Sequence, residues 1–69
     1  MKIKIGFRDS PFCTAETIGD TISWEGENTQ GVRSIADFYS RKYDVKGDDL
    51  LKLLASRLKG NTWASIVKE

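Results

Sequence analysis

The chain has 69 residues, 39% of them hydrophobic and 30% charged, and its 11 basic and 10 acidic residues leave a formal net charge of +1. This length fits one small domain, and no overall charge excess points to nucleic acid, an anionic membrane or an acidic substrate. The absence of histidine excludes a Ser-His-Asp triad and a Cys-His pair, and the single cysteine excludes an internal disulfide and a multi-cysteine zinc site.

No segment has the character of a membrane or targeting sequence. The longest uninterrupted apolar run is Leu53-Leu54-Ala55, whereas a membrane-spanning helix needs about 20 apolar residues and a signal peptide about 7 to 15. A small domain that lacks disulfides is typical of a reducing compartment. We therefore expect a cytoplasmic protein that makes no membrane contact.

Residues 2–8 alternate between apolar and basic side chains. The apolar members of this alternation are Ile3, Ile5 and Phe7, and its basic members are Lys2, Lys4 and Arg8. A period of two predicts a half-buried strand with the basic side chains on its outer side. The Asp9-Ser10-Pro11 segment that follows predicts a turn.

A hairpin is predicted next, with strands over residues 12–18 and 21–25 joined by the two-residue loop Gly19-Asp20. Glycine tolerates the positive φ that a type II′ turn needs at its first central position. This loop pairs Ile18 with Thr21, and paired residues share a face of the sheet. The resulting inner face is mostly apolar and holds Cys13, Ala15, Thr17, Ile22 and Trp24.

The apolar period changes after an expected loop over residues 26–31. Apolar side chains then recur at steps of three and four residues, and this spacing predicts a helix from residue 32 or 34 to residue 43. Ser34 and Asp37 form a weak capping box near its start. The apolar residues with this spacing are Val32, Ile35, Ala36, Tyr39 and Tyr43.

A second helix is predicted over residues 48–59, where Asp48 is a favourable N-cap and Gly60 is placed to end the helix. The tail over residues 61–69 is ambiguous. Its apolar residues have helical spacing behind a Thr62 cap, yet they are also good strand formers. We favour a third helix there, with a last strand beside the first strand as the alternative.

The predicted fold is α+β. Residues 1–25 form a three-stranded antiparallel β-meander, residues 26–31 a loop, and residues 32–69 a helical part of two or three helices packed on one face of the sheet. The whole chain, residues 1–69, is one domain. Its expected core is Ile3, Ile5, Phe7, Ala15, Ile22, Trp24, Ile35, Phe38, Tyr39, Leu50, Leu54 and Leu58.

The leucines from residue 50 to residue 58 spread over more than one side of a helix, and an exposed apolar patch of this kind marks a partner surface or self-association. Residues 9–31 carry five acids and no base, so we expect them to orient a partner. We therefore predict a non-enzymatic protein-binding module: an adaptor, an accessory subunit or an inhibitor of the kind that mobile genetic elements encode. The predicted docking residues are Leu51, Leu53, Tyr43, Trp63, Glu25 and Glu27.

The alternative is a small nucleic-acid-binding domain. It would use either the basic outer side of the first strand or a helix-turn-helix over residues 34–59. Glu16 and Glu25 oppose the first version because they share the outer face, and Asp48 and Asp49 oppose the second because they start the recognition helix. The basic residues in question are Lys2, Lys4, Arg8, Arg41, Lys42 and Lys46.

No residue pattern predicts a catalytic, cofactor or metal site. Asp9 with Glu16, or Asp48 with Asp49, are carboxylate pairs, but carboxylates in turns and helix caps are far commoner than catalytic or Mg²⁺-binding pairs. Cys13 is expected on the inner face as a small buried apolar residue and not as a reactive thiol. We therefore expect no catalytic residue, no cofactor, no metal ligand and no small-molecule substrate.

Overall fold

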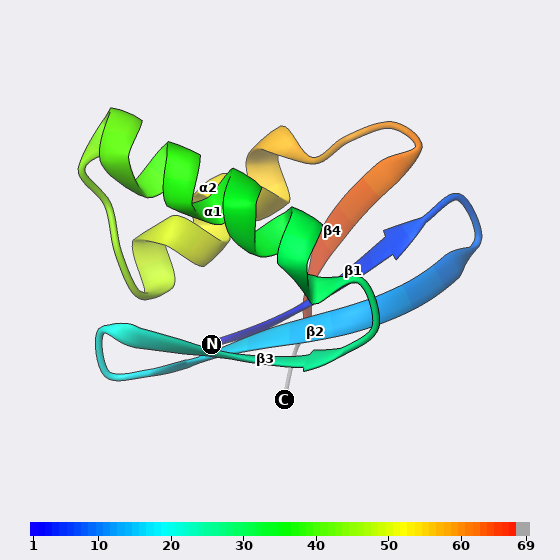
Figure 1. Cartoon of the computed structure of the whole chain (residues 1–69), viewed down its shortest axis with the longest axis horizontal. Coiled ribbons are helices and arrows are strands. Elements are labelled where there is room, and N and C mark those ends of the chain that lie inside the picture. Colours follow the sequence, from blue (N-terminus) through cyan, green and yellow to red (C-terminus); the bar gives the residue numbers. More distant parts are fainter. Residues whose placement is uncertain (68–69) are drawn as a thin grey trace.

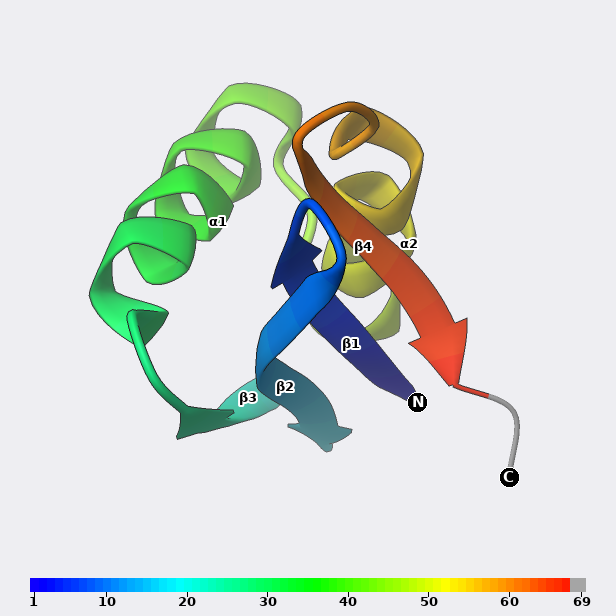
Figure 2. The same cartoon turned by 90° about the vertical axis from the view of Figure 1, so that its right-hand side faces the viewer.

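Six regular elements follow one another along residues 1–67, the part of the chain that the computed structural model describes. They are β1 (Lys2–Phe7), β2 (Ser10–Ile18), β3 (Thr21–Gly26), α1 (Thr29–Tyr43), α2 (Asp48–Arg57) and β4 (Thr62–Val67). The strands form one antiparallel sheet in the order β3-β2-β1-β4. Both helices lie on the same side of this sheet (Figures 1 and 2), and the other side is called the open face below. The predicted α+β fold with three N-terminal antiparallel strands is confirmed.

The hairpin of β2 and β3 has the predicted register. Ile18 pairs with Thr21, and Ala15 pairs with Trp24. Gly19 has a φ of 63°, which is the sign that a type II′ turn requires at its first central position. The register turns Ala15 toward the helices, where it is fully buried.

β1 buries Ile3 and Ile5 completely, as its alternation predicts, but Phe7 at its end is 47% exposed. The register between β1 and β2 shifts at this end, so that Ile5 pairs with Cys13 whereas Gly6 pairs with Pro11. A bulge of this kind bends and twists the end of a strand. The prediction that Phe7 belongs to the core is therefore wrong.

The C-terminal segment is a strand and not a third helix. β4 pairs with β1 from Lys2 opposite Val67 to Phe7 opposite Thr62. The preference for a helix over residues 61–69 is wrong, the alternative of a last strand beside the first is confirmed, and residues 68–69 lie outside the described part. The expected helical part thus ends with α2, because pairing with β1 covers an edge of the sheet that is otherwise unpaired.

α1 begins earlier than predicted, at Thr29, so that part of the expected loop is helical. Asn28 precedes the helix with a φ of 53° and makes no side-chain cap hydrogen bond. Ser34 lies inside the helix, where its hydroxyl donates to the Gln30 carbonyl at 3.0 Å. The expected capping box of Ser34 and Asp37 is therefore wrong.

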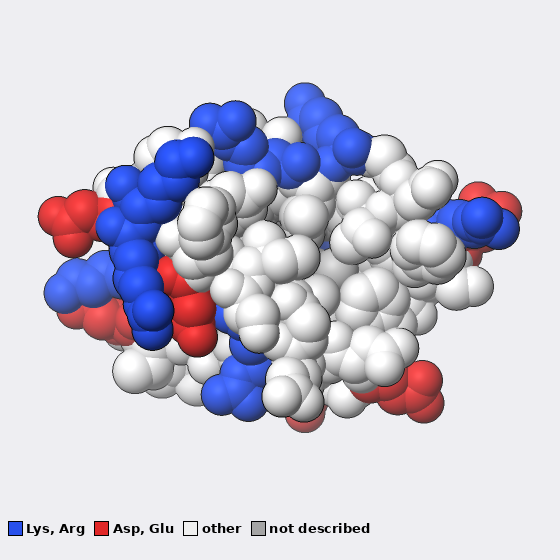
Figure 3. All heavy atoms as spheres, turned by 45° about the horizontal axis from the view of Figure 1, so that its top comes forward, with Lys and Arg blue, Asp and Glu red and all other residues white. Residues whose placement is uncertain are grey.

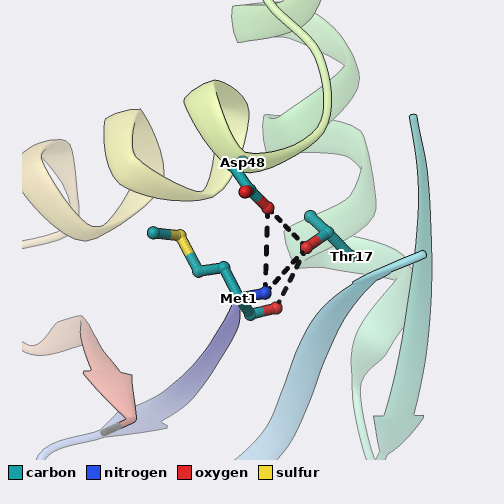
Figure 4. Close-up of polar contacts among 3 residues, drawn as sticks. All are labelled: Met1, Thr17 and Asp48. Atoms are coloured by element: carbon teal, nitrogen blue, oxygen red, sulfur yellow. Dashed lines mark hydrogen bonds and ion pairs between the residues drawn. The ribbon is translucent and has the colours of Figure 1, made fainter. Parts of the chain in front are cut away.

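α2 ends at Arg57, earlier than predicted, and Asp48 is its first residue after the N-cap Gly47. The Asp48 carboxylate accepts a hydrogen bond from the Thr17 hydroxyl at 2.5 Å and lies 3.8 Å from the N-terminal ammonium of Met1 (Figure 4). Asp48 therefore links the start of α2 to the sheet, and α2 has no side-chain cap hydrogen bond at its N-terminus.

The core lies between the sheet and the two helices. Its buried residues are Ile3, Ile5, Cys13, Ala15, Val32, Ala36, Leu50, Leu51 and Leu54. The predicted core residues that are half-buried against it are Ile22, Trp24, Tyr39 and Leu58. Ile35 and Phe38 are 36% and 57% exposed, so their placement in the core is wrong. α1 instead faces the interior with the smaller Val32 and Ala36.

Candidate interaction surface

α1 carries a row of large side chains on a side that it does not turn toward the sheet. Ile35 is 36% exposed, Phe38 57% and Tyr43 38%. The ring of Tyr39 lies between the last two, with its centroid 5.6 Å from that of Phe38 and 5.9 Å from that of Tyr43. Residues three and four apart are neighbours on a helix. Ile35, Phe38, Tyr39, Lys42 and Tyr43 together are called the α1 surface below.

Two cations lie against these rings. The Nζ atom of Lys42 is 5.6 Å from the ring centroid of Phe38 and 5.4 Å from that of Tyr43. The Arg57 guanidinium, from the end of α2, is 5.4 Å from the Tyr43 centroid and donates a hydrogen bond to the Tyr43 hydroxyl at 3.2 Å. On the helix side of the molecule, Figure 3 shows a broad uncharged area with Lys and Arg side chains along its left and upper margins. The surface therefore combines exposed aromatic rings with positive charge.

The leucine-rich part of α2 is not a free surface. Leu51, a predicted docking residue, is 0% exposed, and its neighbours Leu50 and Leu54 are also buried. Leu53 is half-buried. The wide apolar arc of α2 is covered because this helix packs against β1, β2 and β4 and also against α1. Leu51 is therefore a core residue, and its assignment to a docking surface is wrong.

Trp63 and the predicted acidic docking residues lie elsewhere. Trp63 is on the open face of β4, where its indole N–H donates to the Arg8 carbonyl. Glu25 also belongs to the open face, on β3, and Glu27 is exposed between β3 and α1. Of the six predicted docking residues, Tyr43 alone belongs to the α1 surface. The structure does not bring the six together.

The predicted nucleic-acid residues divide between opposite sides of the molecule. Lys2 and Lys4 lie on the open face, where strand pairing sets Glu16 opposite Lys2. Arg8 is in the turn between β1 and β2, with its guanidinium 5.4 Å from the Phe7 ring centroid. The acid opposite Lys2 offsets the positive charge that this face would offer to a phosphate backbone.

The remaining basic residues lie on the helix side. Arg41 and Lys42 are in the last turn of α1, where a cation interacts favourably with the helix dipole. Lys46 lies in the connection between α1 and α2, and its Nζ atom is 3.6 Å from a carboxylate oxygen of Asp20. No single strip of the molecule therefore joins these residues to Lys2 and Lys4.

Sequence reasoning missed the exposure of Ile35 and Phe38 because it placed these larger apolar residues of α1 in the core, and not the smaller Val32 and Ala36. Val32 and Ala36 are four residues apart and fill the buried stripe of this helix. Ile35 is next to Ala36 in sequence and so lies about 100° around the helix from it. A second stripe of larger residues beside a stripe of small ones was the available signal.

Among the described residues, no group of three or more metal-ligating side chains lies close enough together to hold an ion, and neither helix has the length and apolarity to cross a membrane.

Cys13 is 5% exposed, and burial raises the pKa of its thiol. A protonated, buried thiol is a poor nucleophile at neutral pH.

No protein-family model, curated protein or solved structure matches the chain. Within residues 1–67, the feature that best suits a binding function is the α1 surface, because it joins exposed apolar side chains to cations.

Proposed function

We propose that this chain is a non-enzymatic protein-binding module that docks through the α1 surface. The observation that supports this most directly is Phe38, which is 57% exposed and lies beside Tyr39. Burying apolar surface at an interface contributes roughly 25 cal/mol per Å². Aromatic residues and arginine are also the types on which binding energy concentrates.

The partner that fits this surface is apolar at its centre and acidic at its margin. Lys42 and Arg57 already lie against aromatic rings, and an acidic group of the partner can pair with each cation without displacing it. Glu25 and Glu27 lie away from the α1 surface, so we assign the orienting role to these cations and not to the acidic residues 9–31. Docking then acts by occlusion, as in an adaptor, an accessory subunit or an inhibitor.

Capture of the partner from a native lysate tests this proposal when three forms of the chain are compared. Phe38→Asp removes the exposed ring, and Ile18→Asp is the matched control because Ile18 is 64% exposed on β2. We expect a protein that survives nuclease treatment and is retained by the wild-type and Ile18→Asp chains. Its recovery should fall at least about tenfold with Phe38→Asp. Equal recovery by all three forms would contradict docking through this surface.

Single-stranded nucleic acid is a second candidate for the same surface. Bases stack on exposed aromatic rings while cations pair with phosphates, and Lys42 between Phe38 and Tyr43 has this arrangement. The net charge of +1 gives the candidate little further support. It predicts that nuclease abolishes capture, that binding weakens steeply with salt, and that Lys42→Glu removes it.

A further inference from the structure

Half of the backbone groups of β3 have no partner strand. β3 lies at one edge of the sheet (Figure 2), and antiparallel pairing turns the N–H and C=O groups of alternate residues toward the neighbouring strand. The Glu27 N–H donates to the Phe12 carbonyl of β2. The backbone N–H and C=O groups of the odd-numbered residues of β3 therefore face β2, and the backbone groups of Ile22 and Trp24 face outward. Within residues 1–67, no backbone group of another segment bonds to Ile22 or Trp24.

A groove of about 310 Å³ lies between this free edge and α1. Its apolar lining residues are Ile22, Trp24, Ala36 and Leu50. Lys46 and Asp20 also line it and form an ion pair at 3.6 Å. The volume is near the lower limit of ligand clefts, roughly 300 Å³. A strand rises about 3.4 Å per residue, so a segment of about three or four residues spans the two outward-facing residues of β3.

The opposite edge of the sheet is protected. The Ala64 N–H of β4 points away from β1 and donates to the Leu58 carbonyl at 3.2 Å, so the connection from α2 covers the middle of that edge. β3 has no such cover in the described residues, and it contains neither proline nor lysine. Those residues are common devices that keep an edge strand from pairing. The β3 edge is therefore more accessible to an added strand than the β4 edge.

Charge at the rim of the groove favours a polypeptide over a polyanion. The rim carries two cations, Arg33 and Lys46, and two anions, Asp20 and Asp37. Lys46 pairs with Asp20, whereas Arg33 and Asp37 form no ion pair within the described residues. Nucleic acid would find no excess positive charge here. A peptide can set an acidic group against Arg33 and a basic group against Asp37.

We propose that the groove between β3 and α1 binds an extended segment of a partner protein, which adds to the sheet as a strand beside β3. Main-chain hydrogen bonds to Ile22 and Trp24 supply affinity in this mode, and pockets for alternate side chains supply specificity. The side chains that turn toward the groove lining meet Ala36 and Leu50 and are therefore small or apolar. This site is separate from the α1 surface and does not depend on it.

The probe for this site is a library of random peptides displayed on phage, selected against the intact chain and then made synthetically. Selected peptides should be apolar at alternate positions. Replacing their residues one at a time by N-methyl equivalents tests the binding mode, because only every second N–H faces β3. We expect affinity to fall about tenfold at alternate positions and to change little between them.

Two variants of the chain complete the test. Ile22→Pro removes an outward N–H and leaves the bonds to β2, since proline is tolerated on edge strands whose N–H faces solvent. It should weaken peptide binding about tenfold. Arg33→Glu changes an exposed rim residue and should weaken binding of peptides that carry an acidic residue there. Arg41→Glu is the matched control, because it makes the same charge change on α1 outside the groove.

Three results would overturn the proposal: no peptide selected above background, equal sensitivity to N-methylation at every position, or binding unchanged by both Ile22→Pro and Arg33→Glu. Sedimentation over a concentration series identifies another occupant. If the chain dimerises and Ile22→Pro abolishes the dimer, a second copy occupies the edge and a partner segment is ruled out. Phe38→Asp should retain peptide binding, which separates this proposal from docking through the α1 surface.

Discussion

The two helices lie on the same side of the sheet but use their apolar residues differently. α2 spans 10 residues and buries Leu50, Leu51 and Leu54. α1 spans 15 residues and buries only Val32 and Ala36. The shorter helix therefore contributes more of the large buried side chains, and the longer helix leaves its larger residues in contact with water.

Position in the fold explains the difference. α2 packs against β1, β2 and β4 and is flanked by α1, so several of its sides are covered. α1 packs against β3 and α2, and its remaining sides stay open. A helix at the margin of a layer needs only a narrow apolar stripe to hold it in place. Large apolar residues outside that stripe are then available for a partner.

The largest expected effect comes from truncating Leu51, one of the buried leucines of α2. Leu51 is 0% exposed, so Leu51→Ala should lower the free energy of unfolding by about 2–5 kcal/mol through lost burial and a cavity. Phe38 is 57% exposed, and Phe38→Ala should change it by less than about 0.5 kcal/mol. Urea denaturation followed by circular dichroism measures both values.

Leu53 provides the internal control for that contrast, because it is half-buried on the same helix as Leu51. The loss in free energy of unfolding caused by Leu53→Ala should therefore lie between the losses caused by Leu51→Ala and Phe38→Ala. If Phe38→Ala destabilised the domain as much as Leu51→Ala, α1 would be as central to the core as α2. The distinction between the two helices would then be wrong, and with it the case for docking through α1.

A smaller, pH-dependent effect tests how α2 is held at its start. The hydrogen bond from Thr17, with added attraction from the N-terminal ammonium and Lys52, lowers the pKa of the Asp48 carboxyl below its ordinary value of 3.8. Because the folded state favours the ionised form, Asp48 stabilises the fold at neutral pH. This stabilisation is lost as the pH falls below 3.8 and through the lowered pKa.

Asp48→Asn should therefore be less stable than the wild-type chain at neutral pH, and the difference should shrink as the pH falls toward about 2. Urea midpoints over this pH range measure the change. Asp49→Asn is the matched control for loss of negative charge in the first turn of α2, since it removes no contact to Thr17. A difference between Asp48→Asn and wild type that stayed constant with pH would rule out this anchor.

Local sequence was sufficient for the β2–β3 hairpin and insufficient for β4. In the hairpin, Gly19-Asp20 and the apolar alternation each specify the same register, so two independent signals agree. Trp63, Ile66 and Val67 fit both a helical period and a strand. What decides between them is the unpaired edge of β1, which is far away in sequence and makes no local signal.

The candidate surface was less predictable than the fold. Leu51 and Phe38 carry the same apolar signal, and only the packing of α2 between the sheet and α1 separates a core residue from an exposed one. Of the predicted docking residues, Tyr43 is 38% exposed on α1, whereas Trp63 is on the opposite face because it belongs to a strand. Surface composition depends on which element covers which, and this is a tertiary property.

The smallest expected effect concerns the N-termini of the two helices. The first turn of α2 holds Asp48 and Asp49, whereas the first turn of α1 holds no acidic residue. An acid there interacts favourably with the helix dipole. Gln30 is exposed in this turn, and Gln30→Glu should raise the free energy of unfolding by about 0.3–1 kcal/mol at low ionic strength. Because the gain is electrostatic, it should fade at about 1 M salt, and a gain that persisted there would point to helix propensity instead.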